Sequence, residues 1–279
     1  NPDTSGWDTS QVETFAFMFL RAPAATPATS GWVTSSATTM QGMFLDASVA
    51  SPDTSGWDTS NVTLMSSMFQ GALAADPDTS SWDTSQVTTF SYMFSGATSA
   101  DPDTSTWDTS QVTDMQYMFR NTPADPETSG WITASVTDMR GMFEGASVAN
   151  PDTSGWDTSS VMRMEYMFKD AVAAAPDTSG WDTSKVTTMF AMFDGAFSAN
   201  PDMSGWSLPD VVNMTDMFSG MDIGVTSYSG LLITLAADNA NTEVELSGGA
   251  SQYDAEGAVA RAYLVDTLGW TITDGGPSL

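Results

Sequence analysis

The sequence contains no cysteine and no histidine, and it has only 7 lysine and arginine residues against 35 aspartate and glutamate residues. The lack of cysteine excludes disulfides and thiolate metal sites. Because the usual nucleophile and base residues are missing, we expect no enzymatic activity. A net charge of −28 repels nucleic acid and anionic membranes, so we expect neither as a partner. No stretch is long and apolar enough to suggest membrane insertion.

What the sequence does contain is a repeat. The unit x-P-D-T-S-G-W-D-T-S-x-V-T-x-M-x-x-M-F-x-x-A returns nine times, every 25 residues with one interval of 24. A fixed period of this length is typical of solenoids, in which each repeat buries its apolar side against its neighbours. The tryptophans that mark the repeats are Trp7, Trp32, Trp57, Trp82, Trp107, Trp131, Trp156, Trp181 and Trp206.

The third repeat shows the pattern within one unit. Residues 54–59 are small and β-tolerant around Trp57, which predicts a short strand. Thr59 and Ser60 then precede a stripe of apolar residues at helical spacing, where their hydroxyls would cap a short helix. We expect Trp57 and this stripe to be buried; its residues are Val62, Met65, Met68, Phe69 and Ala72.

The sequence therefore predicts an α/β solenoid over residues 1–222. We expect a right-handed, leucine-rich-repeat-like array of nine strand–short-helix repeats, with the strands paired in register as a parallel sheet. The residues that follow differ in composition and predict an α/β cap over 223–274, because a solenoid needs a polar lid on its exposed end. Residues 275–279 are predicted to be a linker. Within the cap we expect helices at 231–237 and 255–268 and strands at 244–246 and 270–273.

Two rows of acidic residues run along the array, one after the proline and one after the tryptophan of each repeat. Carboxylates one strand apart repel each other by roughly 1 to 3.5 kcal/mol, so something should neutralise them. Calcium takes six to eight oxygen ligands in flexible geometry, which favours Ca²⁺ as the bound ion. The alternative is an unligated acidic surface that keeps the chain soluble. The predicted metal ligands are seven residues of these rows, Asp53, Asp58, Asp78, Asp83, Asp103, Asp108 and Glu127, together with Asp76, Asp101 and Asp125, which directly precede the proline in repeats four to six.

The unit W-D-T-S-x-V-T-x-M-x-x-M-F, as in residues 107–119, resembles BspA-type bacterial leucine-rich-repeat surface proteins. The tail from Gly249-Ala250-Ser251 to Asp274-Gly275-Gly276 is similar to the ending of the same proteins. The resemblance implies a secreted or cell-surface module of a large adhesin, used for attachment and cohesion, with no catalytic residues. Members of that family usually carry an aliphatic residue where this chain has a threonine, at Thr4, Thr54 and Thr79.

We therefore expect a bacterial cell-surface adhesin module, a domain of a larger protein, that mediates cell attachment or cell–cell cohesion. Its expected partner is itself, as a calcium-dependent homodimer, or another cell-surface protein. The acidic clusters of repeats three to six should lie nearest the dimer contact, and the first repeat offers a further surface at Trp7 and Phe19. Three alternatives stay open: a passive spacer in a surface stalk, ice binding by aligned threonines such as Thr54 and Thr79, and carbohydrate binding by exposed tryptophans.

Overall fold

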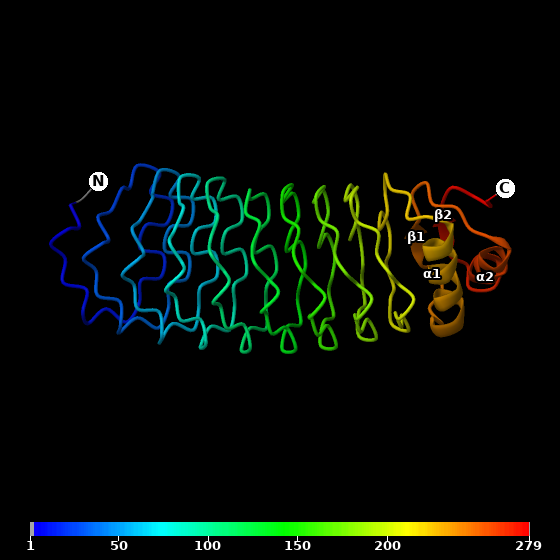
Figure 1. Cartoon of the computed structure of the whole chain (residues 1–279), viewed down its shortest axis with the longest axis horizontal. Coiled ribbons are helices and arrows are strands. Elements are labelled where there is room, and N and C mark those ends of the chain that lie inside the picture. Colours follow the sequence, from blue (N-terminus) through cyan, green and yellow to red (C-terminus); the bar gives the residue numbers. More distant parts are fainter. Residues whose placement is uncertain (1–2, 279) are drawn as a thin grey trace.

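The computed structural model describes residues 3–278 as a long stack of irregular turns that ends in two helices and two short strands (Figure 1). Asn1 and Pro2 of the predicted first repeat, and Leu279 of the predicted linker, lie outside the described residues. The regular elements are α1 (Val225–Asp238), β1 (Glu245–Ser247), α2 (Ala255–Asp266) and β2 (Thr271–Thr273).

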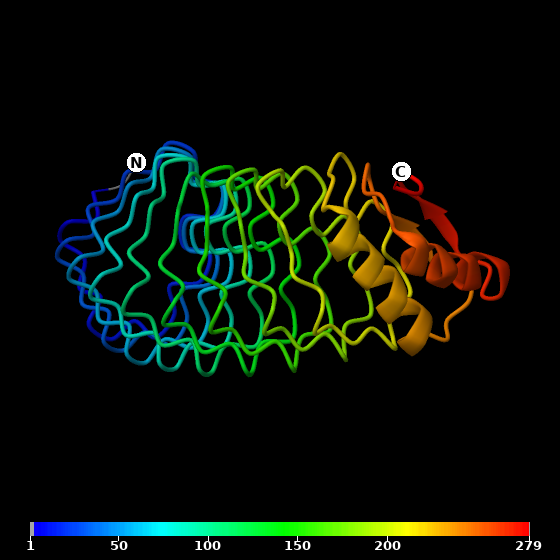
Figure 2. The same cartoon turned by 45° about the vertical axis from the view of Figure 1, so that its right-hand side comes forward.

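Successive repeats lie side by side along the stack (Figures 1 and 2). Each contributes one residue to a row of isolated parallel bridges, so that a residue in one repeat pairs with its equivalent in the next. The row runs through Thr14, Thr39, Leu64, Thr89, Asp114, Asp138, Arg163, Thr188 and Asn213. The backbone of every repeat is therefore bonded to its neighbours.

The predicted α/β leucine-rich-repeat-like solenoid of strand–short-helix repeats is wrong. Within residues 3–278, both helices and both strands lie after Gly224, and none falls in the repeats. The segment 54–59, expected to be a strand, holds a turn that the N–H of Trp57 closes by donating to the carbonyl of Thr54 (3.0 Å). The parallel bridges fall instead in the part of each repeat that was expected to be helical.

The apolar side chains of each repeat point inward because one residue has a left-handed backbone conformation, and not because the segment is a helix. Ser67 has φ of 57°, which turns the chain between Met65 and Phe69. The N–H groups of Met65, Ser67 and Phe69 donate to carbonyls of the next repeat, at 3.4, 2.8 and 2.9 Å, so they are not used for bonds within a helix. The equivalent residue is left-handed throughout the stack: Phe17, Gly42, Ser67, Tyr92, Tyr117, Gly141, Tyr166, Ala191 and Asp216.

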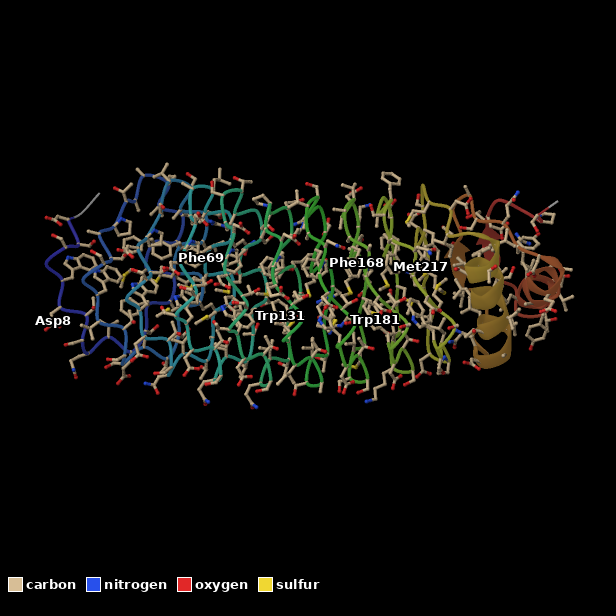
Figure 3. The ribbon with its side chains drawn as sticks, in the orientation of Figure 1. Asp8, Phe69, Trp131, Phe168, Trp181 and Met217 are labelled. Carbon is tan, nitrogen blue, oxygen red and sulfur yellow. The ribbon has the colours of Figure 1, made fainter. Side chains whose placement is uncertain are left out.

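The predicted core is confirmed. Trp57 is 3% exposed, and Met65, Met68 and Phe69 are fully buried. Equivalent rings from successive repeats stack on one another, with phenylalanine centroids 5.4–5.8 Å apart from Phe19 to Phe218. Figure 3 shows members of the phenylalanine and tryptophan rows along the length of the stack. Each repeat therefore gains its core from the repeats on both sides.

Two columns of buried threonines join the repeats by hydrogen bonds. Thr54 donates its hydroxyl to the carbonyl of Asp78 (2.7 Å), and Thr59 donates to the carbonyl of Asp83 (2.9 Å). Thr59 therefore links repeats and does not cap a helix. Both are at most 1% exposed, so these hydroxyls do not form a surface array, and the expectation of ice binding by Thr54 and Thr79 loses its basis. The columns explain why threonine replaces an aliphatic residue here.

The helices and strands expected after the repeats are confirmed, with α1 beginning six residues earlier than predicted. Strand β1 pairs in parallel with β2, and Leu246 of β1 also bridges Met214, which continues the ladder of the repeats. The amide of Asn239 donates to the carbonyls of Leu208 and Val211, both at 2.8 Å. The tail is thus bonded to the last repeat; the division at residue 222 stays a prediction. In residues 3–278, no helix has the length and apolar character that a membrane span requires.

Candidate functional site

The acidic rows lie on the surface and stabilise turns. All ten predicted ligands are exposed. Oδ1 of Asp78 accepts the N–H (3.1 Å) and the hydroxyl (2.6 Å) of Ser80, the geometry of an Asx-turn. The same carboxylate-to-serine turn is formed by Asp53, Asp58, Asp83, Asp103, Asp108 and Glu127, each with the serine two residues later.

The remaining predicted ligands link one repeat to the next. Oδ1 of Asp76 accepts the N–H of Asp101 (3.2 Å), and Oδ1 of Asp125 accepts the N–H of Asn150 (2.8 Å). Stacking of the repeats therefore places equivalent residues of successive repeats beside each other. Across residues 3–278, it brings no three acidic side chains into a group that could hold a metal ion. Calcium binding stays a prediction.

Because of these carboxylate turns, the stability of the folded chain is expected to depend on pH. Serine hydroxyls and N–H groups hold the pKa values of Asp78, Asp103 and Asp152 below the ordinary value. Because the folded pKa is lowered, this stability is present above the unfolded pKa of about 3.9 and is lost as the pH falls through the folded pKa. We expect the unfolding temperature, followed by circular dichroism, to fall below about pH 4. Ser80→Ala with Ser105→Ala should weaken that fall. A rise on acidification would mean that relief of charge repulsion outweighs the turns.

One face of the stack carries residues that differ between repeats. Of the seven basic residues, four lie at neighbouring positions of the repeat around the left-handed residue: Arg120, Arg140, Arg163 and Lys169. The three tyrosines of residues 1–222 all occupy the left-handed position itself: Tyr92, Tyr117 and Tyr166. We call this surface the tyrosine face and define it by Tyr92, Tyr117, Arg120, Arg140, Glu144, Glu165, Tyr166 and Phe190.

The aromatic rings of the tyrosine face form two pairs. Tyr92 and Tyr117 are stacked, with centroids 4.9 Å apart and an angle of 25° between the rings. Tyr166 meets Phe190 edge to face at 5.0 Å and 76°. Burial raises the pKa of Tyr92 and of Tyr117, so both phenols are neutral at physiological pH. The pairs hold the rings in fixed orientations.

A glycine separates the two pairs. Gly141 stands between Tyr117 and Tyr166 in the left-handed column, with φ of 54°. The Tyr117 ring lies over it, since a Cβ on Gly141 would be 2.2 Å from that ring. Two hollows share the rings of Tyr117 and Tyr166 as lining. One of about 330 Å³ is completed by Arg140, Glu165, Thr188, Phe190 and Asn213, and the other, of about 370 Å³, by Tyr92, Arg120 and Glu144.

The arginines of the tyrosine face have carboxylate partners. Arg140 donates from Nε and Nη2 to buried Asp138 (3.0 and 2.9 Å) and from Nη2 to Gln116 in the preceding repeat (2.8 Å). Arg120 pairs with Glu144 at 3.1 Å. Glu165 differs: its Oε2 is buried and has no hydrogen-bond partner in the described chain, and burial raises its pKa. The face therefore holds paired cations and one carboxylate oxygen that lacks a donor.

The sequence-based interpretation missed this face because it looked for function in what the repeats share. A signal was present: in residues 1–222 tyrosine occurs only directly before the M-F pair of a repeat, a position that otherwise varies.

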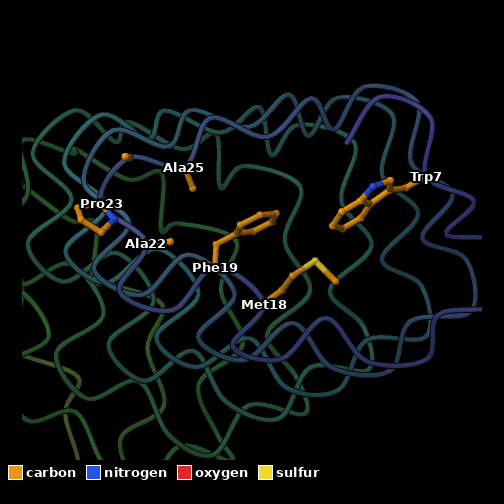
Figure 4. A pocket seen from close by; sticks show the side chains of 7 residues that line it. Trp7, Met18, Phe19, Ala22, Pro23 and Ala25 are labelled. Carbon is orange, nitrogen blue, oxygen red and sulfur yellow. The ribbon is translucent and has the colours of Figure 1, made fainter. Parts of the chain in front are cut away.

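The first repeat carries an apolar hollow of about 400 Å³ (Figure 4). Trp7 stacks on Trp32 at 5.9 Å and is 43% exposed, whereas Trp57 is 3% exposed. The hollow is lined by Trp7, Met18, Phe19, Ala22, Pro23, Ala24 and Ala25. Of the two residues predicted to form an open surface, Trp7 is exposed, but Phe19 is buried under the residues around it. That a second copy covers Trp7 stays a prediction.

Comparison with known proteins identifies the repeats. No curated protein and no solved structure matches the chain. The sequence pattern of one family, described as "Mycoplasma protein of unknown function, DUF285", matches residues 1–57, 38–126 and 123–226. Together these matches span the whole stack of repeats and most of the chain, so the protein belongs to the DUF285 family.

Proposed function

We propose that this protein is an adhesion module that binds another protein through the tyrosine face. The observation that carries the proposal is the gathering of three tyrosines and two arginines around two hollows on an otherwise regular stack: Tyr92, Tyr117, Tyr166, Arg120 and Arg140. Tyrosine and arginine are the residue types enriched among those that dominate binding energy at protein interfaces. The repeats supply the frame, and the positions that vary supply the specificity.

The rigidity of the face supports the same function. Backbone hydrogen bonds join each repeat to its neighbours. Arg140 also donates hydrogen bonds to Asp138 in its own repeat and to Gln116 in the preceding repeat. A surface whose side chains are already fixed loses little conformational entropy on binding. Half-buried rings held in pairs are therefore suited to a stable contact.

The resemblance to BspA-type repeats supports a secreted or cell-surface location, as a bacterial adhesin domain within a larger protein. Membership of a bacterial repeat family agrees with this proposal. The absence of histidine and cysteine supports a binding role and not a catalytic one.

Attachment of beads coated with the chain to bacterial and animal cells tests the proposal. We expect firm attachment to at least one cell type, and a loss of attachment when Tyr92, Tyr117 and Tyr166 are all replaced by serine. Beads that attach to no cell type, or that attach equally well with the substituted face, would favour a passive spacer.

Calcium-dependent self-association is the second part of the proposal. The exposed carboxylates around Asp78, Asp101 and Asp103 give each copy an acidic surface, and a shared divalent ion would reverse the repulsion between two such surfaces. We expect light scattering to show a dimer in millimolar calcium and a monomer in chelator, with dimerisation reduced by replacing the three aspartates with asparagine. A monomeric mass in both buffers would contradict it.

A further inference from the structure

We propose that the hollow between Tyr117 and Tyr166 binds the guanidinium group of an arginine side chain from a basic partner. The inference rests on the proposed function and names the chemistry that the tyrosine face recognises. We call this hollow of about 330 Å³, with Glu165 in its lining, the slot.

The walls of the slot suit a flat cation. Tyr117 and Tyr166 line it, and the Tyr117 ring lies over Gly141, which stands between the two tyrosines in the left-handed column. Guanidinium groups bind to tyrosine ring faces within about 6 Å of the centroid. The protein already uses this contact, since Arg120 lies 5.7 Å from the centre of the Tyr117 ring.

The polar lining supplies acceptors. Oε2 of Glu165 is buried with no hydrogen-bond partner among residues 3–278, and Glu165 lines the hollow together with the polar residues Thr188 and Asn213. A buried acceptor without a donor is unfavourable, so a ligand that donates to it is selected over one that does not. Arginine offers five N–H donors in a planar fork, which matches a carboxylate flanked by aromatic walls.

The charges near the slot favour a cation over an anion. Arg140 also lines it, but its Nε and Nη2 groups are bonded to Asp138 and Gln116. The charge of Arg140 is thus balanced by Asp138, whereas Oε2 of Glu165 lacks a donor, which a cationic ligand supplies. The net charge of −28 attracts a basic partner from a distance and speeds its approach.

The test uses the blocked peptide acetyl-Gly-Arg-Gly-amide and the whole chain with isotope-labelled tyrosine rings. We expect the ring signals of Tyr117 and Tyr166 to shift on titration, while those of Tyr253 and Tyr263 in the tail stay in place. The citrulline peptide, which has nearly the same shape and no charge, should bind at least about tenfold more weakly, equivalent to about 1.4 kcal/mol.

Two variants that each remove one negative charge distinguish binding in the slot from general attraction of a basic peptide to an acidic protein. Glu165→Gln should weaken binding of the arginine peptide at least about tenfold, whereas Asp157→Asn in the exposed row should change it less than twofold. Glu165→Gln removes a half-buried charge, so its unfolding temperature should not fall. Equal weakening by both variants, or equal binding of the citrulline peptide, would overturn the proposal.

The result also separates this inference from the proposed function. One outcome is that beads carrying Glu165→Gln attach to cells as well as the wild type while the tyrosine substitutions abolish attachment. That result would contradict arginine binding in the slot and would support protein binding by the tyrosine face. If neither change affects attachment, the proposed function itself fails.

Discussion

Replacing Phe119 with alanine is expected to lower the free energy of unfolding by about 3–5 kcal/mol, the usual loss for a large buried ring. Phe119 is fully buried near the middle of the stack, and its ring lies 5.7 Å from Phe94 and 5.8 Å from Phe143. Because each repeat is stabilised only by its neighbours, a cavity here weakens the link between the two halves. Unfolding in urea should therefore change from one transition to two.

Tryptophan fluorescence and circular dichroism measure this change, since tryptophans lie in both halves of the stack. Phe197→Ala is the matched control because Phe197 is 68% exposed. The control should alter stability by less than about 0.5 kcal/mol, as expected for a surface substitution. A single unfolding transition, with a loss of only about 1 kcal/mol in the free energy of unfolding for Phe119→Ala, would contradict this account. It would show that the stability of one repeat does not depend on its neighbours.

Replacing Tyr117 and Tyr166 together with alanine should reduce bead attachment at least about tenfold. Residues that dominate an interface each contribute about 2 kcal/mol or more, and these two rings line both hollows of the tyrosine face. Their loss also removes the partners of Tyr92 and Phe190, so the remaining rings lose their fixed orientation.

Tyr263→Ala is the control for this experiment, because Tyr263 lies in α2 and is 45% exposed. Both proteins should keep the unfolding temperature of the wild type within a few degrees, so that a loss of attachment reflects the surface. Equal attachment by the double variant and the control would exclude the tyrosine face as the contact.

The sequence predicted the period and the core correctly because both follow from the spacing of large apolar residues. Trp57, Met65, Met68 and Phe69 are buried as expected, and the helices and strands of the tail were located within a few residues. Burial depends on which side chains are apolar, and the repeat unit shows that directly.

The conformation within the repeat could not be predicted from the same spacing. Intervals of three and four residues between apolar positions are typical of a helix, but a left-handed residue such as Ser67 produces the same inward orientation. Such a conformation is uncommon for residues other than glycine, so propensity argues against it. Here the hydrogen bonds to the next repeat stabilise it, and those bonds exist only once the repeats have stacked.

The candidate metal site was predicted from the alignment of negative charges. That reasoning identified the rows of Asp53 and Asp58 but not the turns that their carboxylates stabilise. The serine two residues after each aspartate was the available signal. The tyrosine face depends on which residues of different repeats become neighbours. Glu165 and Tyr117 belong to repeats two apart in the sequence, and they line the same hollow only because the repeats stack.

Bead attachment in buffer with chelator tests the central claim most directly, because it removes any role of calcium. Three proteins are compared: the wild type, the variant with serine at Tyr92, Tyr117 and Tyr166, and a variant with asparagine at Asp53, Asp78 and Asp103. We predict that the wild type and the asparagine variant attach equally and that the serine variant does not attach. Loss of attachment by the asparagine variant, with full attachment by the serine variant, would contradict the assignment of binding to the tyrosine face.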